Sequence, residues 1–424
     1  MAEVIRYDNG LRVIVEHFPA LRSAAVGIFA GAGSVNETAA DNGLAHFTEH
    51  MMFKGTDKLS PFEVAAAFED KGAMVNAFTS KECTCYYFKS VDESVEACFK
   101  TLGHIFFDST YPADELDKER KVIIEEINMG EDDPADICYD LIAEALYGAD
   151  PLARPVIGTI DNVRRFGGDD IRRWVRTHYR PDNVVLSFAG CVTPEAADRL
   201  VRTYILDRFE TIPADCPAAA PTAVPAAPVA GAFRERIKDF EQSNIAVAYP
   251  TIPFNDALSM TQSVLNLIAG GGMSSRLFQN IRERQGLAYS VYTSPAAYRN
   301  SGSFAVYLNI TAANAARTCE SVRRELDSLA AGGVTDDEFA RARTQLKSAL
   351  LFGQENCQSV MLSIGKLLLM CDEAYDLDKR LREIDAVTAA DVNAFIRRYI
   401  RPDSVCAAYV GRAYDADILK IMKE

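Results

Sequence analysis

The feature that most constrains the fold is an internal repeat. The stretch DIRRWVRTHYRPDNVVLSFAG at residues 170–190 reappears as DVNAFIRRYIRPDSVCAAYVG at residues 391–411, a constant offset of 221 positions. Both copies predict a helix, an Arg-Pro-Asp stop and an apolar strand, because proline lacks an amide N–H and restricts the residue before it. A duplicated order of elements predicts two homologous domains, each with its own core.

A proline- and alanine-rich segment separates the two copies. Residues 212–233 show no helical or strand periodicity, and such a composition is typical of a semi-extended linker. We therefore predict an N-terminal domain over residues 1–211, this linker, and a C-terminal domain over residues 234–424. Each half begins with strands and continues with long amphipathic segments, such as 113–129 and 336–352. This order favours an α+β fold, with helices packed on one side of a mostly antiparallel sheet in each domain.

Composition argues against several classes of protein. The chain is 48% apolar and 25% charged, which is ordinary for a globular protein, and no apolar run approaches the length of a membrane span. The N-terminal residues lack the basic and apolar regions of a secretion signal. A net charge of −15 argues against broad nucleic-acid binding. The ten cysteines are scattered without a C-x-x-C pair, which indicates reduced, buried thiols and a cytoplasmic location.

One short motif concentrates metal-binding chemistry. His46 and His50, two of only five histidines, stand four residues apart with Glu49 between them. Residues i, i+3 and i+4 share one face of a helix, so the two imidazoles form a ligand pair suited to Zn²⁺ and the carboxylate can take a proton from water. Asp41 or Asn42 can cap the N-terminus of this helix. The alternative is a surface helix that happens to carry polar residues.

A third ligand must come from elsewhere, because a catalytic zinc usually has three protein ligands and one open position. The acidic segment 114–133 is predicted to be helical, and it presents Glu119 and Glu126, seven residues apart, on one face. Spacing alone does not say which acidic residue binds, and a solvated acidic face is the alternative. The remaining histidines fit structural positions better: His17, His104 and His178.

The second half carries no copy of the motif. The position 221 residues after His46 is Leu267, within SVLNLIAGGGMSSRLF. The glycines of that stretch do not follow the GxxxxGK[ST] pattern of a phosphate-binding loop, so a flexible hinge is the better interpretation. Metal chemistry is therefore expected in the first half only.

The order HxxEH is inverted relative to HExxH and is that of an inverzincin motif. With it, nearly the whole chain resembles the pitrilysin-like metallopeptidases of the insulinase and mitochondrial processing peptidase type. The resemblance implies one zinc ion per chain, held by His46, His50 and the glutamate about 76 residues later, which is Glu126. It implies that Glu119 orients the ligands and that Glu49 is the catalytic base.

Two further segments carry the resemblance. GAMVNAFTSKECTCYYF, at residues 72–88, resembles the family's edge strand, which implies that Asn76 and Ala77 pair with the substrate backbone. SSRLFQNIRERQGLAYSVYTS resembles the family's Arg/Tyr element. That likeness implies that Arg282 helps to hold the substrate and that Tyr289 donates a hydrogen bond to the developing oxyanion.

The resemblance also implies an architecture and a function. It implies an endopeptidase that hydrolyses unfolded peptides inside an enclosed chamber. Larger relatives carry four such domains, so this two-domain chain is expected to form a homodimeric clamshell in which Arg282 and Tyr289 reach the zinc of the other chain. The alternatives are a heterodimer with a related subunit and a non-catalytic or partner-dependent subunit of a processing-peptidase-like complex. The intact motif residues favour an active enzyme.

Overall fold

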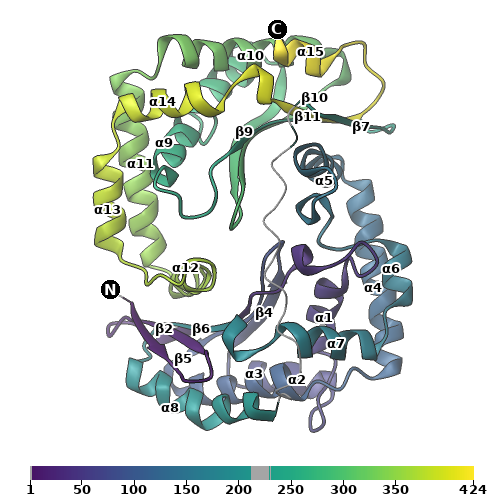
Figure 1. Cartoon of the computed structure of the whole chain (residues 1–424), viewed down its shortest axis with the longest axis vertical. Helices are drawn as coiled ribbons and strands as arrows, with labels where there is room; N and C mark the ends of the chain where they lie inside the picture. The colour runs from purple at the N-terminus through teal and green to yellow at the C-terminus, as the bar shows by residue number, and fades with distance from the viewer. Residues whose placement is uncertain (1, 212–228, 230) are drawn as a thin grey trace. The chain divides into compact units, whose positions relative to one another are not determined.

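The computed structural model describes residues 2–211, 229 and 231–424, and Figure 1 shows their course. They divide into two compact units. The first unit comprises Met1–Ile127, Pro155–Ala223 and Phe352–Leu377, and the second comprises Asn128–Arg154, Val224–Leu351 and Asp378–Glu424. Each unit therefore includes a segment from the other half of the sequence, so the units do not coincide with the contiguous domains 1–211 and 234–424. The predicted linker, 212–233, lies mostly outside the described residues.

The first unit is built on a mixed sheet. In its described part the strand order is β1-β2-β6-β3-β5-β4, and neighbours are antiparallel except for the parallel pair β2 and β6. The strands are β1 (Glu3–Arg6), β2 (Arg12–His17), β3 (Ser23–Ala30), β4 (Met74–Thr79), β5 (Thr84–Val91) and β6 (Val184–Gly190). The associated helices are α1 (Leu44–Met52), α2 (Pro61–Glu69), α3 (Val95–Asp108), α4 (Ala113–Asp132), α6 (Ile160–Arg165), α7 (Gly168–His178), α8 (Pro194–Tyr204) and α12 (Cys357–Cys371).

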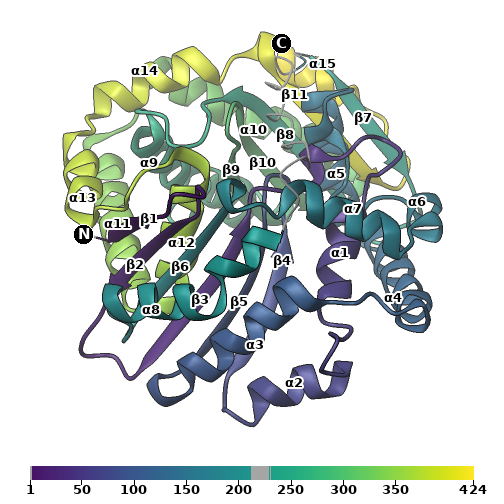
Figure 2. The same cartoon turned by 60° about the horizontal axis from the view of Figure 1, so that its bottom comes forward.

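Strand alternation gives this sheet two covered faces. Val26 and Ile28 of β3 belong to one buried cluster with apolar side chains of α1, α3, α7 and α8, and Figure 2 shows α3 and α8 along that side. Phe29 points the other way, against Gly365 of α12, where an added Cβ would lie 2.4 Å from the ring. Helices were predicted on one side only; this prediction misses α12, which comes from the second half of the sequence.

The second unit repeats this plan. Its described sheet has the order β7-β11-β8-β10-β9, in which only β7 and β11 are parallel neighbours. The strands are β7 (Phe233–Ile237), β8 (Ser243–Thr251), β9 (Ala288–Ala297), β10 (Gly302–Ile310) and β11 (Cys406–Gly411). The associated helices are α5 (Pro134–Tyr147), α9 (Ser259–Ala269), α10 (Ala315–Gly332), α11 (Asp336–Gln354), α13 (Leu377–Ala386), α14 (Ala389–Tyr399), α15 (Ile418–Lys423) and the short π-helix η6 (Phe278–Arg284).

Helix α5 of the first half lies on the face of the second sheet opposite its main core. Cys406 of β11 directs its sulfur at the carbonyl oxygen of Ala145 in α5. The exchange is therefore reciprocal, because α5 covers the second sheet as α12 covers the first. Short 3₁₀ turns complete the chain: η1 (Ser34–Asn36), η2 (Asp92–Ser94), η3 (Pro151–Ala153), η4 (Pro181–Asn183), η5 (Leu206–Thr211), η7 (Ala312–Asn314) and η8 (Pro402–Ser404).

The repeat predicted from sequence is confirmed at the level of elements. Residues 170–190 form α7, η4 and β6, and residues 391–411 form α14, η8 and β11. Both strands end in a glycine with positive φ, +122° at Gly190 and +149° at Gly411, and an added Cβ would lie 2.2 Å and 2.1 Å from a neighbouring serine oxygen. Glycine is therefore required at both strand ends.

Membrane-spanning helices and disulfides can be assessed for the described residues. Within 2–211, 229 and 231–424, no helix combines the length and the apolar character needed to cross a bilayer. The cysteines of that part are free of disulfides, and most of them are buried.

Candidate metal centre

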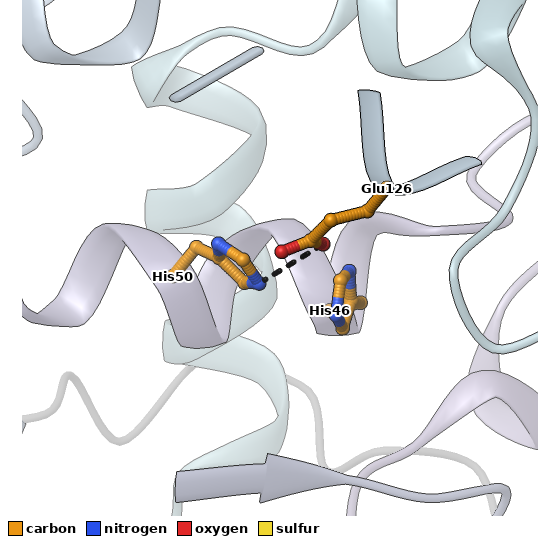
Figure 3. A group of neighbouring side chains, drawn as sticks. All are labelled: His46, His50 and Glu126. Atoms are coloured by element: carbon orange, nitrogen blue, oxygen red, sulfur yellow. Dashed lines mark ion pairs between the residues drawn. The ribbon is translucent and has the colours of Figure 1, made fainter. Parts of the chain in front are cut away.

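Three side chains from two helices converge in the first unit. His46 and His50 belong to α1 and Glu126 belongs to α4, and one ligand atom from each lies within 4.8 Å of the others. The Glu126 carboxylate lies between the two imidazole rings (Figure 3), and its Oε2 is 3.7 Å from Nε2 of His50. Among the described residues, no second group of three His, Cys, Asp or Glu side chains comes together in this way.

His46 is prepared to act as a neutral ligand. Burial, and then the charge of nearby His50, lowers the pKa of His46 to about 4. The two imidazole rings have centroids 4.5 Å apart and are tilted by 60°. A neutral imidazole keeps a nitrogen lone pair for a metal ion at neutral pH.

His50 is oriented by a carboxylate on its far side. Its Nδ1 lies 2.7 Å from Oε1 of Glu119, and the second Glu119 oxygen lies 2.6 Å from Nζ of Lys54. An ionised carboxylate only accepts hydrogen bonds, so Nδ1 of His50 carries the proton and Nε2 faces Glu126. Burial lowers the pKa of His50, but the hydrogen bond to Glu119 and the surrounding carboxylates outweigh burial and raise it overall.

The buried Glu119 and the partly exposed Lys54 form an ion pair behind the ligands. The Glu119 side chain is 6% exposed. Burial raises its pKa, but the bonds to His50 and Lys54 outweigh burial, so the pKa is lowered overall and the carboxylate stays ionised. The sequence pointed to Glu119 through the family resemblance. Lys54, four residues after His50 and just beyond the end of α1 at Met52, was missed.

Glu49 is held beside the ligands as a half-buried carboxylate. Its Oε2 accepts a hydrogen bond from the Thr79 hydroxyl of β4 at 2.6 Å. Burial raises the pKa of Glu49 and outweighs the hydrogen bond from Thr79 and the charge of His50, which both lower it. Thr79 was not recognised from the sequence, because nothing in its spacing links it to a helix thirty residues earlier.

The start of α1 differs from the prediction. Neither Asp41 nor Asn42 caps the helix; the N-cap is Gly43, with φ of +100°. Glu37, which is 4% exposed, takes over that role, since its carboxylate accepts hydrogen bonds from the amides of Gly43 at 2.9 Å and Ala45 at 2.7 Å. A buried negative charge at a helix N-terminus is favourable. It fixes the turn that carries His46.

Helix α4 presents Glu119 and Glu126 on the face that also carries its buried residues. The buried residues of this helix are Leu116, Glu119 and Ile123, and Glu126 follows on the same stripe at helical spacing. Leu116 and Ile123 pack into the core. They therefore anchor the helix so that Glu119 and Glu126 face α1.

The strand predicted to receive substrate is an edge strand. β4 ends the sheet order of the first unit. The amide of Ser80 bonds to the carbonyl oxygen of Cys83 at 2.8 Å, and pairing alternates along the β4–β5 register, so the N–H of Ala77 points away from β5. That N–H donates to the side-chain oxygen of Asn76 at 2.8 Å.

Arg282 and Tyr289 come together in the second unit. The guanidinium of Arg282 in η6 lies 5.8 Å from the ring centroid of Tyr289 in β9 and 4.9 Å from that of Phe278. The Tyr289 side chain is 78% exposed. The pair singled out by the resemblance therefore forms one exposed cation–π group.

The other histidines occupy structural positions. Nδ1 of His104 lies 2.8 Å from the Asp108 carboxylate one turn later. His178 packs against Trp174 with ring centroids 4.0 Å apart and a tilt of 45°, and burial lowers the pKa of His178 to about 4. His17, His104 and His178 are not part of the three-residue group described above.

The donor set fits zinc. Two imidazole nitrogens and one carboxylate oxygen form a ligand combination found in catalytic zinc sites, which leave a fourth position open. The Glu119 carboxylate behind His50 matches the partner that zinc-bound histidines normally have. The site is therefore chemically suited to a zinc ion whose fourth ligand is water or substrate.

Comparison with known sequences matches most of the chain. A family model described as Insulinase (Peptidase family M16) matches residues 12–160, and one described as Peptidase M16 inactive domain matches residues 165–346. The uncharacterized zinc protease YmxG of Bacillus subtilis is 36% identical over 94% of this chain and 96% of its own length. The uncharacterized zinc protease SCO5738 of Streptomyces coelicolor is 39% identical over 92% of this chain and 85% of its own length.

Solved structures agree with the fold. A structure described as a peptidase M16 inactive domain from Pseudomonas fluorescens has a TM-score of 0.89 at 20% identity and covers 98% of this chain and 99% of its own. A protease from Helicobacter pylori also has a TM-score of 0.89 at 20% identity, with coverage of 97% and 99%. The fold, the two matched segments and the relatives agree: the chain belongs to peptidase family M16, the pitrilysin-like family.

Proposed function

We propose that this chain is a zinc-dependent endopeptidase that binds one zinc ion through His46, His50 and Glu126. The observation that carries the proposal is the convergence of these three ligand atoms within 4.8 Å, with the half-buried carboxylate of Glu49 on the same helix face. Membership of family M16 and the names of the relatives, which are called zinc proteases, support it.

The reaction follows from the placement of these groups. Bound zinc supplies a Lewis acid that polarises the scissile carbonyl and lowers the pKa of water towards about 7. Glu49 takes a proton from the attacking water and passes it to the leaving amine. Because burial raises the pKa of Glu49, it is a stronger base than an exposed glutamate. The Thr79 hydroxyl holds its second oxygen in place.

Substrate binding uses the free edge of β4. An extended peptide can add to this edge as a further strand, with contacts at Asn76 and Ala77. To donate to the peptide, the Ala77 N–H must first break its hydrogen bond to the Asn76 side chain. The Asn76 side chain therefore occupies this N–H at the strand edge until a substrate binds. Arg282 holds the substrate, and Tyr289 donates a hydrogen bond to the developing oxyanion.

The assembly belongs to the same proposal. A homodimer forming a closed clamshell would admit unfolded peptides, with Arg282 and Tyr289 acting on the zinc centre of the other chain, in the cytoplasm and without nucleic-acid or membrane partners. Mixing Glu49→Gln chains with Tyr289→Phe chains tests the shared site, because activity then returns only in mixed dimers. No recovery in the mixture would place each site within one chain, and activity only with a related subunit would indicate a heterodimer.

The decisive test is Glu49→Gln. Since the carboxylate is a base and not a ligand, the variant should retain one zinc per chain by metal analysis and lose about 10²- to 10⁴-fold in peptide hydrolysis. Glu125→Gln, on the exposed side of α4, is the matched control and should behave as wild type. A Glu49→Gln enzyme with wild-type activity would refute the assigned base. Purified wild-type chain that binds zinc but cleaves no peptide would instead favour a partner-dependent subunit.

A further inference from the structure

A hydrogen-bonded chain of three side chains runs from helix α12 to the free edge of the first sheet; Figure 2 shows α12, β5 and β4. Gln358, in the first turn of α12, donates through Nε2 to the hydroxyl oxygen of Tyr87 in β5 at 3.5 Å. The same hydroxyl is hydrogen-bonded to the side chain of Asn76 in β4. All three residues belong to the first unit. The chain therefore joins a helix from the second half of the sequence to the edge strand.

Strand pairing explains why these side chains meet. Asn76 and Tyr87 are register partners in the antiparallel pair β4–β5, so their side chains lie side by side on one face of the sheet. The ring of Phe78, two residues after Asn76, has its centroid 6.4 Å from that of Tyr87 and 6.5 Å from that of Phe29. Phe29 points at Gly365 of α12. The shared face is therefore the one that α12 covers.

The hydrogen bonds fix the orientation of the Asn76 amide. Its Oδ1 accepts from the N–H of Ala77 at 2.8 Å. Burial raises the pKa of Tyr87, whereas the hydrogen bond with Asn76 lowers it, as expected when the phenolic oxygen accepts. Nδ2 is the donor of an asparagine side chain, so it points to Tyr87 while Oδ1 points to Ala77. A flipped amide would set two N–H groups against each other.

This arrangement orders a side chain that would otherwise be mobile. Asn76 is exposed, whereas Tyr87 and Gln358 are half-buried. An exposed side chain loses rotamer freedom when a ligand binds it, which weakens binding. Tyr87, whose ring packs against Phe78 and whose oxygen accepts from Gln358, supplies a fixed partner. The Asn76 amide is therefore oriented before a ligand arrives.

The oriented amide can recognise a peptide main chain. An amide oxygen has two lone pairs, so Oδ1 of Asn76 can accept a peptide N–H in addition to that of Ala77 or in its place. Main-chain N–H groups are the donors that an extended peptide presents at regular spacing to a sheet edge. A main-chain contact of this kind depends little on the side chains of the peptide.

We propose that Tyr87 is a positioning residue for peptide binding, which acts through Asn76 and is supported by Gln358 of α12. The inference rests on the proposed peptidase function, which supplies an extended peptide as the ligand of β4. Tyr87 holds the Asn76 amide so that its oxygen accepts an N–H of the peptide main chain. A substitution at Tyr87 therefore weakens peptide binding and leaves the chemical step unchanged.

Two substitutions with matched controls test the proposal. Tyr87→Phe keeps the ring and removes the hydroxyl; its control is Tyr7→Phe, which removes a hydroxyl bonded to Asp198. Gln358→Leu removes the donor on α12. Its control is Gln354→Leu, because Gln354 makes a similar bond to a tyrosine hydroxyl at 3.3 Å, four residues earlier.

The first measurement is the Kd of a fluorescent blocked peptide, by anisotropy with chelator present so that no hydrolysis occurs. Tyr87→Phe should raise Kd about fivefold, and Gln358→Leu about twofold, because each loses one hydrogen bond. With zinc restored, KM should rise by the same factors while kcat stays within about twofold. Both controls should behave as wild type. An unchanged Kd in folded Tyr87→Phe, or a fall in kcat with constant KM, would overturn the proposal.

A double variant tests whether Tyr87 acts through Asn76. Asn76→Ala should raise Kd about fivefold or more, and adding Tyr87→Phe should then cost nothing further, because residues that act through one contact are not additive. Should Tyr87→Phe fail to fold, Gln358→Leu takes its place in the same cycle. Additive losses in the double variant would overturn the proposal, because a general packing role of Tyr87 would persist without Asn76.

Hydrogen exchange provides a measurement that needs neither zinc nor peptide. The Ala77 amide, which donates to Asn76, should exchange at least about threefold faster in Tyr87→Phe than in wild type or Tyr7→Phe. Unchanged exchange would show that Tyr87 does not hold Asn76.

The same measurements separate this proposal from the peptidase function. Faster exchange and weaker peptide binding in Tyr87→Phe, without hydrolysis by the zinc-loaded wild type, would preserve the positioning role and refute the peptidase function. Hydrolysis by wild type, with Kd and Ala77 exchange unchanged in Tyr87→Phe, would do the reverse.

Discussion

The two units share one plan of strands and helices, but among the described residues only the first brings together three side chains that could hold a metal ion. Helix α9 follows β8 in the second unit as α1 follows β3 in the first, and it contacts α14 of the repeat as α1 contacts α7. The positions 221 residues after the three polar residues of α1 are Leu267, Gly270 and Gly271, none of which can bind a metal. Buried apolar side chains maintain the scaffold in both units. The difference shows that a few polar residues can be lost without loss of the fold.

The exchanged helices differ as well. In the first unit Gly365 lets α12 contact Phe29 closely, and Ser187 of β6 donates to the carbonyl oxygen of Met361 in α12 at 2.7 Å. In the second unit Tyr139 and Tyr307 stand between α5 and the sheet, and a cavity of about 440 Å³ is left. A glycine closes the first contact, whereas bulky side chains leave the second one open. The predictions below test this contrast between the units, from the largest expected effect to the smallest.

Removing one metal-ligating side chain should leave the first unit, like the second, unable to bind zinc. His50→Ala takes away one of the three ligands, so we expect zinc content to fall from about one to near zero per chain and hydrolysis to fall at least about 10³-fold. His104→Ala is the control, since His104 bonds only to Asp108 among the contacts described above. Metal analysis after dialysis against buffered zinc measures the effect. Full zinc occupancy in His50→Ala would contradict the assignment.

Weakening the ion pair of Glu119 and Lys54 should give a smaller loss. Glu119→Gln removes the acceptor that orients His50, and we expect zinc affinity to fall about 10- to 100-fold. Lys54→Met, which leaves Glu119 without its cation, should cost about tenfold. Lys58→Met, at an exposed position four residues on, should have no effect. Competition with a zinc-binding dye reports affinity, and equal values for both lysine variants would refute a role for Lys54.

The N-terminal cap of α1 can be tested by removing either the observed capping group, Glu37, or the predicted one, Asp41. Glu37→Ala leaves the amides of Gly43 and Ala45 without an acceptor in a buried site, so we expect about 3 kcal/mol lower unfolding free energy. Asp41→Ala, at the position predicted from sequence as a cap, should cost less than about 1 kcal/mol. Helix α9 has no side-chain cap at Leu258, so it offers no equivalent variant. Urea unfolding of zinc-free protein measures both, and a larger loss in Asp41→Ala would reverse the assignment.

The smallest effect concerns pH. His178 packs against Trp174, and in the repeat Tyr399 packs against Phe395 with ring centroids 4.6 Å apart. Because burial lowers the pKa of His178 to about 4, the unfolded chain binds more protons below about pH 6.5. The stability contributed by neutral His178 is therefore complete above that pH and is lost as pH falls towards 4.

The variant His178→Tyr copies the second unit and should remove this pH dependence. We expect wild type to lose roughly 1–2 kcal/mol more than the variant between pH 7.5 and pH 5, measured by urea unfolding of zinc-free protein at both values. Tyr399→Phe is the control and should leave the pH dependence as in wild type. Identical pH dependence in wild type and His178→Tyr would show that His178 is protonated without cost.

Much of this structure was predictable from local spacing. The helix, stop and strand of residues 170–190 and 391–411, the shared face of His46 and His50, and that of Glu119 and Glu126 all follow from the 3.6-residue and two-residue periods. These predictions hold because each of them depends only on residues within a single helix or strand. Residue spacing left the third ligand open, and the family resemblance pointed to Glu126.

The tertiary structure alone decided which elements meet. Periodicity says which face of a helix is buried but not which sheet buries it, so the exchange of α5 and α12 was not predicted. For the same reason the roles of Glu37, Lys54 and Thr79 were not predicted, because their partners lie on other turns or elements. The tyrosine-lined cavity was not predicted either. The sequence by itself determined the repeated scaffold and the ligand pair on α1; long-range packing determined how that pair is capped, oriented and completed by α4.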